Sequence, residues 1–186
     1  GKVKLTVDFD IQKINRIIIT ACGTSWHSAL IGKHFLESIA QIPAEVDYAS
    51  EFRYRSPIVS SEDVMVVISQ SGETADTLAA LREAKVKQAK TLGIVNVVGS
   101  TITREVDSGI YLHVGPEIGV ASTKAFTSQV VALLLLALYI RQQQGHEIDK
   151  DLLKQLDKIP YQINQALKQA DNIKEVAAKF VDSKNF

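Results

Sequence analysis

Five short runs of apolar and β-branched residues alternate with longer stretches of helical spacing, and this alternation most constrains the fold. The runs occupy residues 16–20, 44–49, 64–69, 91–97 and 109–114. Three of them are nearly continuous apolar segments, as expected for strands covered on both faces. The stretches between them lie at residues 25–42, 74–89 and 100–107. Strand–helix alternation with short turns predicts a three-layer α/β fold with a five-stranded parallel sheet and right-handed crossovers.

After residue 114 the pattern becomes purely helical. It predicts one helix from about residue 123 to 144, which ends near Gly145, and at least one more amphipathic helix from Asp149. The apolar segment 130–140 is too short to span a bilayer and predicts a buried helix. No repeat or obvious linker interrupts the chain, so we expect a single domain over residues 1–186. Its core would occupy about 13–145, and extra C-terminal helices would form an arm over about 146–186.

Charge and cysteine content exclude several classes of partner. The 186 residues include 21 Lys or Arg and 21 Asp or Glu, so no net field attracts nucleic acid or anionic lipid. We therefore expect neither a nucleic-acid nor a membrane partner, and any phosphate recognition must be local. The one cysteine, Cys22, rules out an internal disulfide and suits a reducing compartment. The N-terminus has no long apolar run, so we expect no signal peptide and a cytoplasmic protein.

Small polar residues follow the third predicted strand in the stretch "VVISQSGETADTL", residues 66–78. In parallel sheets, ligands bind at the turns that leave the carboxyl ends of the strands. Hydroxyl side chains gather in three such turns: Thr24 and Ser25; Ser69, Ser71 and Thr74; Ser122 and Thr123. The helix N-termini there expose unpaired N–H groups and a positive dipole end, which suits a phosphate dianion. The sequence therefore predicts a phosphate cradle at residues 69–74.

Helix capping is the competing interpretation, because Ser, Thr and Asp are also the favoured N-cap residues. Taken singly, "GTS" or "STK" is a cap more often than a ligand site. For residues 69–72 a ligand site is the preferred interpretation, since capping needs only one hydroxyl. The chain contains neither G-x-G-x-x-G nor G-x-x-x-x-G-K-[ST], so we expect no dinucleotide or Walker-type nucleotide site.

Other candidate groups favour structural roles. The four histidines share no ligand-like spacing with a carboxylate, so we predict no metal site and no cofactor. Cys22 is interpreted as a small buried residue, since no neighbouring base is identifiable. We expect Glu73 to be the one carboxylate near the predicted site, and we assign it to the turn. The segment "EFRYR", residues 51–55, could bind a substrate anion, but a subunit contact is the preferred interpretation.

Four motifs together resemble the glucosamine-6-phosphate synthase family, the isomerising glutamine–fructose-6-phosphate aminotransferases. They are "ACGTS", "ASEFRYR", "SQSGETADTL" and "EIGVASTKAFT", in this order and at these intervals. The resemblance covers the family's first SIS (sugar isomerase) subdomain over residues 13–145. It implies a flavodoxin-like fold that binds a hexose 6-phosphate, either fructose 6-phosphate or glucosamine 6-phosphate.

The resemblance also implies which positions bind the substrate. These are Thr24, Ser25, Ser69, Gln70, Ser71, Thr74, Val120 (through its backbone) and Ser122. The phosphate would contact Ser69, Gln70, Ser71 and Thr74, whereas Thr24 and Ser122 would face the sugar.

Enzymes of that family contain further parts that this chain lacks. They carry an N-terminal glutaminase domain and a second SIS subdomain, which supplies a Schiff-base lysine, a proton-shuttling glutamate and a ring-opening histidine. None of these motifs occurs in the 186 residues. We therefore expect a fragment of a dimeric enzyme of hexosamine and UDP-N-acetylglucosamine synthesis, with no catalytic residue of its own. The alternatives are a stand-alone phosphosugar-sensing SIS module and a structural dimerisation domain whose turns serve only as caps.

Overall fold

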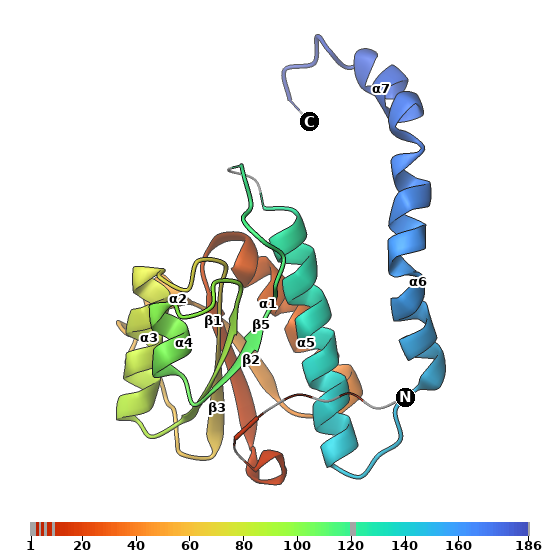
Figure 1. Ribbon diagram of the computed structural model, residues 1–186. Coiled ribbons are helices and arrows are strands. Elements are labelled where there is room, and N and C mark those ends of the chain that lie inside the picture. Colours follow the sequence, from red (N-terminus) through yellow and green to blue (C-terminus); the bar gives the residue numbers. More distant parts are fainter. Residues whose placement is uncertain (1–2, 4, 6, 9, 120–121, 186) are drawn as a thin grey trace. The chain divides into compact units, whose positions relative to one another are not determined.

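Five parallel strands in the order β2-β1-β3-β4-β5 form the sheet of the computed structural model (Figure 1). The structure describes residues 3, 5, 7–8, 10–119 and 122–185. The strands are β1 (Arg16–Ala21), β2 (Ala44–Tyr48), β3 (Asp63–Ser69), β4 (Lys90–Val95) and β5 (Ser108–Tyr111). The predicted three-layer fold with a five-stranded parallel sheet is confirmed.

Two compact units make up the chain, one within Lys2–Glu147 and the other at Ile148–Phe186. The first unit contains the sheet and the helices that cover it. These are η1 (Ile11–Lys13), α1 (Gly23–Phe35), η2 (Leu36–Ala40), α2 (Ala49–Phe52), α3 (Ala75–Val86), α4 (Thr101–Glu105) and α5 (Lys124–Gln143).

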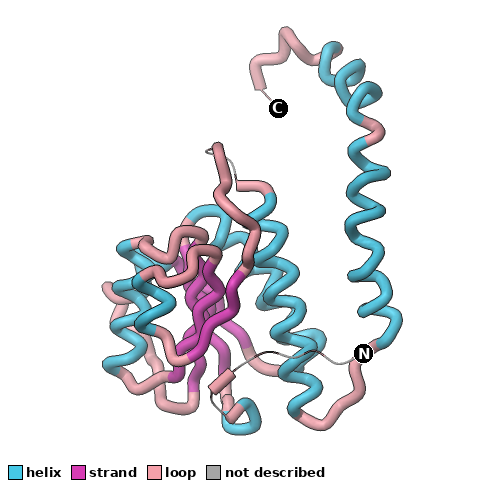
Figure 2. The backbone as a smooth tube through the Cα atoms, in the orientation of Figure 1, coloured by secondary structure: helices cyan, strands magenta, loops and turns pink. Residues whose placement is uncertain are grey.

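Both faces of the sheet are buried, because side chains alternate between two apolar clusters along each strand. Ile17 and Ile19 pack with residues of α1 and α5. Ile18 packs on the opposite face with residues of α2, α3 and α4. Central β3 is buried at all seven positions. The sheet therefore lies as a middle layer between two helical layers, as the magenta strands and cyan helices of Figure 2 show.

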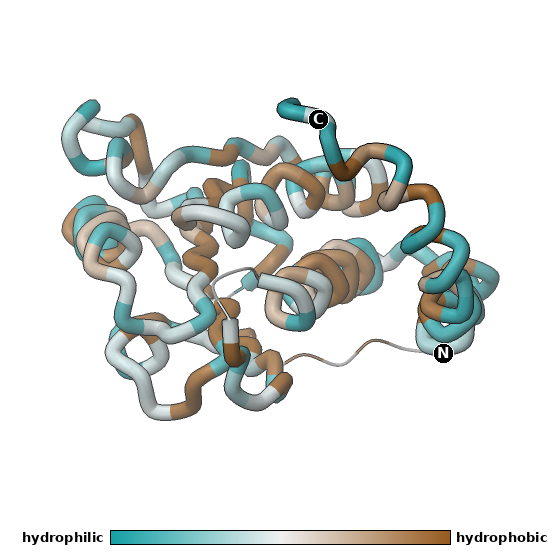
Figure 3. The backbone as a smooth tube through the Cα atoms, turned by 90° about the horizontal axis from the view of Figure 1, so that it is seen from above, coloured by the Kyte–Doolittle hydropathy of each residue, from teal (hydrophilic) through white to brown (hydrophobic). Residues whose placement is uncertain are grey.

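Helix α5 is the buried helix expected from the apolar segment 130–140. Leu133, Leu136, Ala137 and Ile140 are each at most 2% exposed, and Figure 3 shows a largely hydrophobic helix. In the described part of the chain it is the one helix long and apolar enough to cross a membrane, by length and composition alone. Half of its most apolar stretch is buried within the protein.

Local backbone geometry explains where the elements differ from their predicted bounds. The helix predicted over 25–42 starts earlier, at Gly23, and closes with the π-helical turn η2. Gln41 then adopts a left-handed conformation (φ 54°) that redirects the chain into β2. Strand β5 is shorter than predicted, and His113 beyond it also has a positive φ of 53°. The four-residue helix α2 was not predicted.

The second unit consists of two helices, α6 (Lys150–Leu167) and α7 (Ala170–Ala178). The Asp149 carboxylate caps α6 by accepting hydrogen bonds from the backbone N–H groups of Asp151 and Leu152. The amphipathic helix predicted from Asp149 is therefore confirmed. Neither helix has a buried residue among those that the structure describes.

Candidate functional site

Strand order places the topological switch point of this sheet, where open α/β sheets bind ligands, between β1 and β3. The chain moves from β1 to β2 on one side and then crosses to β3 on the other, so the two strands flank the topological switch point. Thr20 of β1 pairs with Val67 of β3 in a parallel register. The turns that leave the carboxyl ends of these two strands are consequently neighbours. The structure thus brings together the predicted turns at residues 23–25 and 69–74.

Hydroxyl groups organise the turn from β3 to α3. The Ser69 and Thr74 hydroxyls are hydrogen-bonded at 2.9 Å, and the Gly72 N–H donates to Ser69 Oγ at 3.0 Å. The Glu73 N–H donates to Ser71 Oγ at 3.2 Å. Thr74 occupies the N-cap position of α3 but makes no side-chain cap hydrogen bond. Capping alone therefore does not account for these hydroxyls, and the first-turn N–H groups of α3 have no intrahelical acceptor.

Gly72 lets this turn pack closely against the start of α4. Its φ is +69°, and a Cβ atom there would lie 2.0 Å from Ser100 Oγ and 2.8 Å from a Val95 methyl group. The Ile102 N–H donates to the Gly72 carbonyl at 3.0 Å. Only glycine fits both the left-handed conformation and the space, so α4 holds the shape of the turn.

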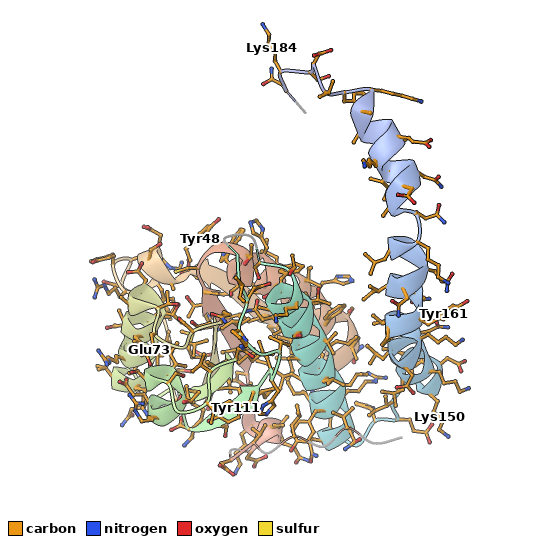
Figure 4. The ribbon with its side chains drawn as sticks, turned by 45° about the horizontal axis from the view of Figure 1, so that its top comes forward. Tyr48, Glu73, Tyr111, Lys150, Tyr161 and Lys184 are labelled. Carbon is orange, nitrogen blue, oxygen red and sulfur yellow. The ribbon has the colours of Figure 1, made fainter. Side chains whose placement is uncertain are left out.

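Glu73 is exposed and belongs to the same turn (Figure 4). One of its carboxylate oxygens accepts a hydrogen bond from the Thr101 N–H at 2.7 Å, at the start of α4. Hydrogen bonds from the Thr101 side chain and N–H group lower the pKa of Glu73, and the charge of Arg104 acts in the same direction. The carboxylate thus acts as an external cap for α4, in agreement with its assignment to the turn.

Gln129 links the first turn of α1 to α5. Its Nε2 donates to Ser25 Oγ at 2.9 Å, and its Oε1 accepts from Ser28 Oγ at 3.0 Å. Gln129 is 1% exposed, whereas Thr24 is exposed and Ser25 is half-buried. Gln129 was not among the residues predicted from the sequence. A single glutamine at the start of an apolar helix is the signal that could have revealed it, since a buried amide requires partners.

Glu117 occupies the N-terminus of α5. Its Oε1 accepts hydrogen bonds from the Thr123 N–H at 2.6 Å and from Thr123 Oγ1 at 2.9 Å, and its Oε2 accepts from Ser122 Oγ at 3.2 Å. These hydrogen bonds lower the pKa of Glu117, and the bond from the Thr123 N–H has the largest effect. The expectation that Glu73 is the one carboxylate near the site is therefore wrong. An acidic residue shortly before a helix start was the available signal. Val120, the remaining predicted position, lies outside the described residues.

A hollow of about 530 Å³ adjoins the predicted cradle. It is lined by Gln70, Asn96, Val97, His113, Gly115, Pro116 and Glu117. The Asn96 side chain holds its outer loop, because its Oδ1 accepts from the Val114 N–H and its Nδ2 donates to the Gly115 carbonyl, both at 2.9 Å. Gln70 follows Ser69 directly, so the hollow continues the predicted phosphate cradle toward Glu117.

The described residues contain no group of three or more His, Cys, Asp or Glu side chains that could hold a metal ion. Cys22 is half-buried at the N-cap position of α1 and makes no side-chain cap hydrogen bond.

Comparison with known proteins gives the relationships of the chain. A glutamine–fructose-6-phosphate aminotransferase (isomerizing) from Chlorobaculum tepidum is 56% identical over 179 residues, which cover 94% of this chain but 29% of that protein. The Bacteroides thetaiotaomicron protein of the same name is 50% identical over 186 residues, covering 97% of this chain and 30% of the relative. The chain thus spans less than a third of either relative.

A solved structure shows the same arrangement of elements. The C-terminal domain of glucosamine-fructose-6-phosphate aminotransferase from Francisella tularensis superposes with a TM-score of 0.87 and 40% identity. The match covers 92% of this chain and 50% of that one. Residues 10–139 match the SIS domain. The chain belongs to the SIS domain family.

Proposed function

We propose that the chain is the hexose-6-phosphate-binding part of an isomerising glutamine–fructose-6-phosphate aminotransferase, an enzyme of hexosamine supply. Fructose 6-phosphate or glucosamine 6-phosphate is bound by Thr24, Ser25, Ser69, Gln70, Ser71, Thr74, Val120 and Ser122. The whole enzyme is a cytoplasmic homodimer, and its glutaminase domain and second SIS subdomain lie outside this chain. The names of the two relatives support this assignment, because each matches nearly the whole chain.

The observation that carries the proposal is the hydroxyl-rich turn at the switch point. Ser69, Ser71 and Thr74 lie where α3 begins, and the N-cap residue makes no side-chain cap bond to the helix. Charge-assisted hydrogen bonds from such donors to a phosphate are worth roughly 1.5–3 kcal/mol each before desolvation losses. Because this chain forms only part of the pocket, we expect dissociation constants on the order of 0.1–10 mM.

The described residues favour substrate binding over catalysis. Isomerisation needs a base close to C1 and C2 of the sugar and an acid for ring opening. Glu73 and Glu117 are both engaged at helix N-termini with lowered pKa values. Hydroxyl groups without an activating partner are poor bases. Binding without these groups stabilises ground state and transition state alike, so the chain alone should not turn fructose 6-phosphate into glucose 6-phosphate.

A thermal unfolding screen tests the proposed function. The chain is melted with fructose 6-phosphate, glucose 6-phosphate, glucosamine 6-phosphate, glucose or inorganic phosphate over a concentration series. The three sugar phosphates should raise the melting temperature progressively, because a ligand that binds only the folded state stabilises it by mass action. Glucose should have no effect. Equal stabilisation by glucose and glucose 6-phosphate would show that the cradle does not bind phosphate, and a flat response to every ligand would favour a purely structural domain.

A further inference from the structure

We infer that Glu117 sets the phosphate specificity of the site: its carboxylate fills the N-terminus of α5 and selects sugar monophosphates over bisphosphates. The inference rests on the proposed function, which places the ligand's phosphate at the turn before α3 and its sugar toward Ser122. It adds a specificity role for Glu117, which lies in the motif "EIGVASTKAFT" but was not among the predicted substrate-binding positions.

The two ends of the proposed site offer opposite hydrogen-bonding chemistry. The N-cap residue of neither α3 nor α5 makes a side-chain cap bond, but at the start of α3 no carboxylate accepts a hydrogen bond from the N–H groups among the described contacts. At the start of α5 the N–H group and hydroxyl of the N-cap residue Thr123 already have a carboxylate acceptor. The Thr123 N–H and hydroxyl both donate to one oxygen of Glu117, at 2.6 and 2.9 Å. Glu73, the carboxylate of the α3 turn, bonds to Thr101 at the start of α4 and leaves the N–H groups of α3 open to an anion, whereas Glu117 already occupies the N-terminus of α5.

Glu117 also fixes the direction of the Ser122 hydroxyl. Ser122 Oγ donates its proton to Glu117 Oε2 across 3.2 Å. With that proton committed, the Ser122 oxygen faces a ligand as an acceptor. A sugar hydroxyl can donate to such an oxygen, whereas a phosphate dianion has no proton to donate. The end of the site at α5 thus fits a neutral polyol and rejects a second phosphate.

The surrounding loop holds Glu117 in place beside the cradle. The Asn96 side chain hydrogen-bonds to the backbone of Val114 and Gly115, which directly precede Pro116 and Glu117 in the chain. Glu117 and Gln70 line the same 530 Å³ hollow, and Gln70 adjoins Ser69 in the cradle. A ligand anchored by its phosphate at residues 69–74 and extended toward Ser122 consequently lies next to the Glu117 carboxylate.

Calorimetric or fluorescence titration of the chain with fructose 6-phosphate and fructose 1,6-bisphosphate tests the inference. The unsubstituted chain should bind the monophosphate about tenfold more tightly, because the second phosphate approaches a fixed carboxylate. In Glu117→Gln, which is isosteric and uncharged, the ratio of the two dissociation constants should fall to about one, mainly through tighter bisphosphate binding. Glu83→Gln on α3, whose carboxylate pairs with Lys87, is the charge-matched control and should keep the original ratio.

The possible failures are distinguishable. If the unsubstituted chain binds neither sugar phosphate, the proposed function is wrong and this inference falls with it. If it binds fructose 6-phosphate but binds the bisphosphate equally well, only the specificity role is overturned, and that comparison needs no variant. The role of Glu117 is also overturned, without affecting the proposed function, if Glu117→Gln leaves the ratio of the two dissociation constants unchanged. The same holds if Glu83→Gln changes that ratio as much as Glu117→Gln does.

Discussion

Gly72 is the residue on which the shape of the proposed phosphate cradle depends most. Gly72→Ala would place a methyl group 2.0 Å from Ser100 Oγ and 2.5 Å from Ser100 Cβ in a left-handed backbone. The combined overpacking and backbone strain should destabilise the fold by roughly 2–4 kcal/mol. Urea unfolding measures this loss, and sugar-phosphate affinity should fall in parallel because the turn must shift.

Gly99 provides the matched control for this substitution. It also has a positive φ, of +75°, but a Cβ atom there would have no neighbour within 4 Å. Gly99→Ala should therefore cost only the backbone term, about 1–2 kcal/mol. Equal losses for the two variants would mean that the contact between Gly72 and Ser100 does not restrict the turn.

Ser71 tests the hydroxyl contribution to phosphate binding. Its side chain is exposed and accepts one hydrogen bond, from the Glu73 N–H. Ser71→Ala should weaken fructose 6-phosphate binding by roughly 1 kcal/mol, or about fivefold, with little change in stability. Ser61→Ala, at an exposed turn before β3, should alter neither property. A large loss of unfolding free energy in Ser71→Ala would instead identify Ser71 as structural.

Some residues of the candidate site could be predicted from the sequence, and others could not. Small polar residues directly after a buried strand revealed the turn at 69–74, because that signal is local. Gln129 bonds to Ser25, 104 positions away, so its role depends on how α1 and α5 pack. Glu117 lies near Ser122 in the chain, but only the path of the loop turns its carboxylate onto the helix.

The same distinction holds for the secondary-structure elements. The three inner strands, β1, β3 and β4, could be predicted because burial on both faces demands nearly continuous apolar runs. The edge strands β2 and β5 are only partly buried, and their shorter β-branched runs predicted them. Helix α2 could not be, since four residues (Ala49–Phe52) are too few to show a helical period. The end of β5 depends on the positive φ of His113, which no hydrophobic pattern encodes.

Helices α4 and α5 begin at carboxylates that belong to neighbouring segments, Glu73 and Glu117. Hydrogen bonds to these groups lower both pKa values below the ordinary 4.5. A group whose pKa is lower in the folded state contributes stability above its unfolded pKa and loses it as the pH falls through the folded value. The urea midpoint should therefore fall as the pH drops below about 4.5, and it should fall less steeply in Glu73→Gln/Glu117→Gln.

Other carboxylates with lowered pKa values, such as Asp63, also contribute to acid unfolding. Urea unfolding from pH 7 to pH 3.5 gives the pH dependence of stability for the double variant and for the unsubstituted chain. The difference between the two curves isolates the contribution of the two capping carboxylates. Identical acid slopes for the two proteins would show that neither carboxylate stabilises its helix.

At the scale of the whole molecule, helices α6 and α7 carry exposed apolar side chains that require cover. On α6 and α7, Ile163, Leu167, Ile173 and Val176 are 46%, 65%, 61% and 53% exposed, and Tyr161, labelled in Figure 4, is 67% exposed. Such surface favours association, and two-fold dimers are the commonest assemblies. We predict a dimer in sedimentation velocity at tens of micromolar chain.

A paired substitution shows whether these helices mediate the association. Leu167→Gln/Ile173→Gln removes two exposed apolar side chains from the second unit and should shift the equilibrium toward monomer. Val86→Gln on α3, which is 79% exposed, is the control and should leave the dimer intact. A strictly monomeric unsubstituted chain would contradict the prediction.

The central claim is that the turn between β3 and α3 binds the phosphate of a hexose 6-phosphate. Residue-resolved amide chemical shifts of the chain, followed during titration with fructose 6-phosphate, test it most directly. The largest changes should occur at residues 69–76, with smaller ones at Thr24, Ser25 and Ser122, and inorganic phosphate should reproduce only the first group. The account would be contradicted by shift changes centred elsewhere, for example in the apolar groove between β5 and α5. Tyr111, labelled in Figure 4, and Leu135 line that groove.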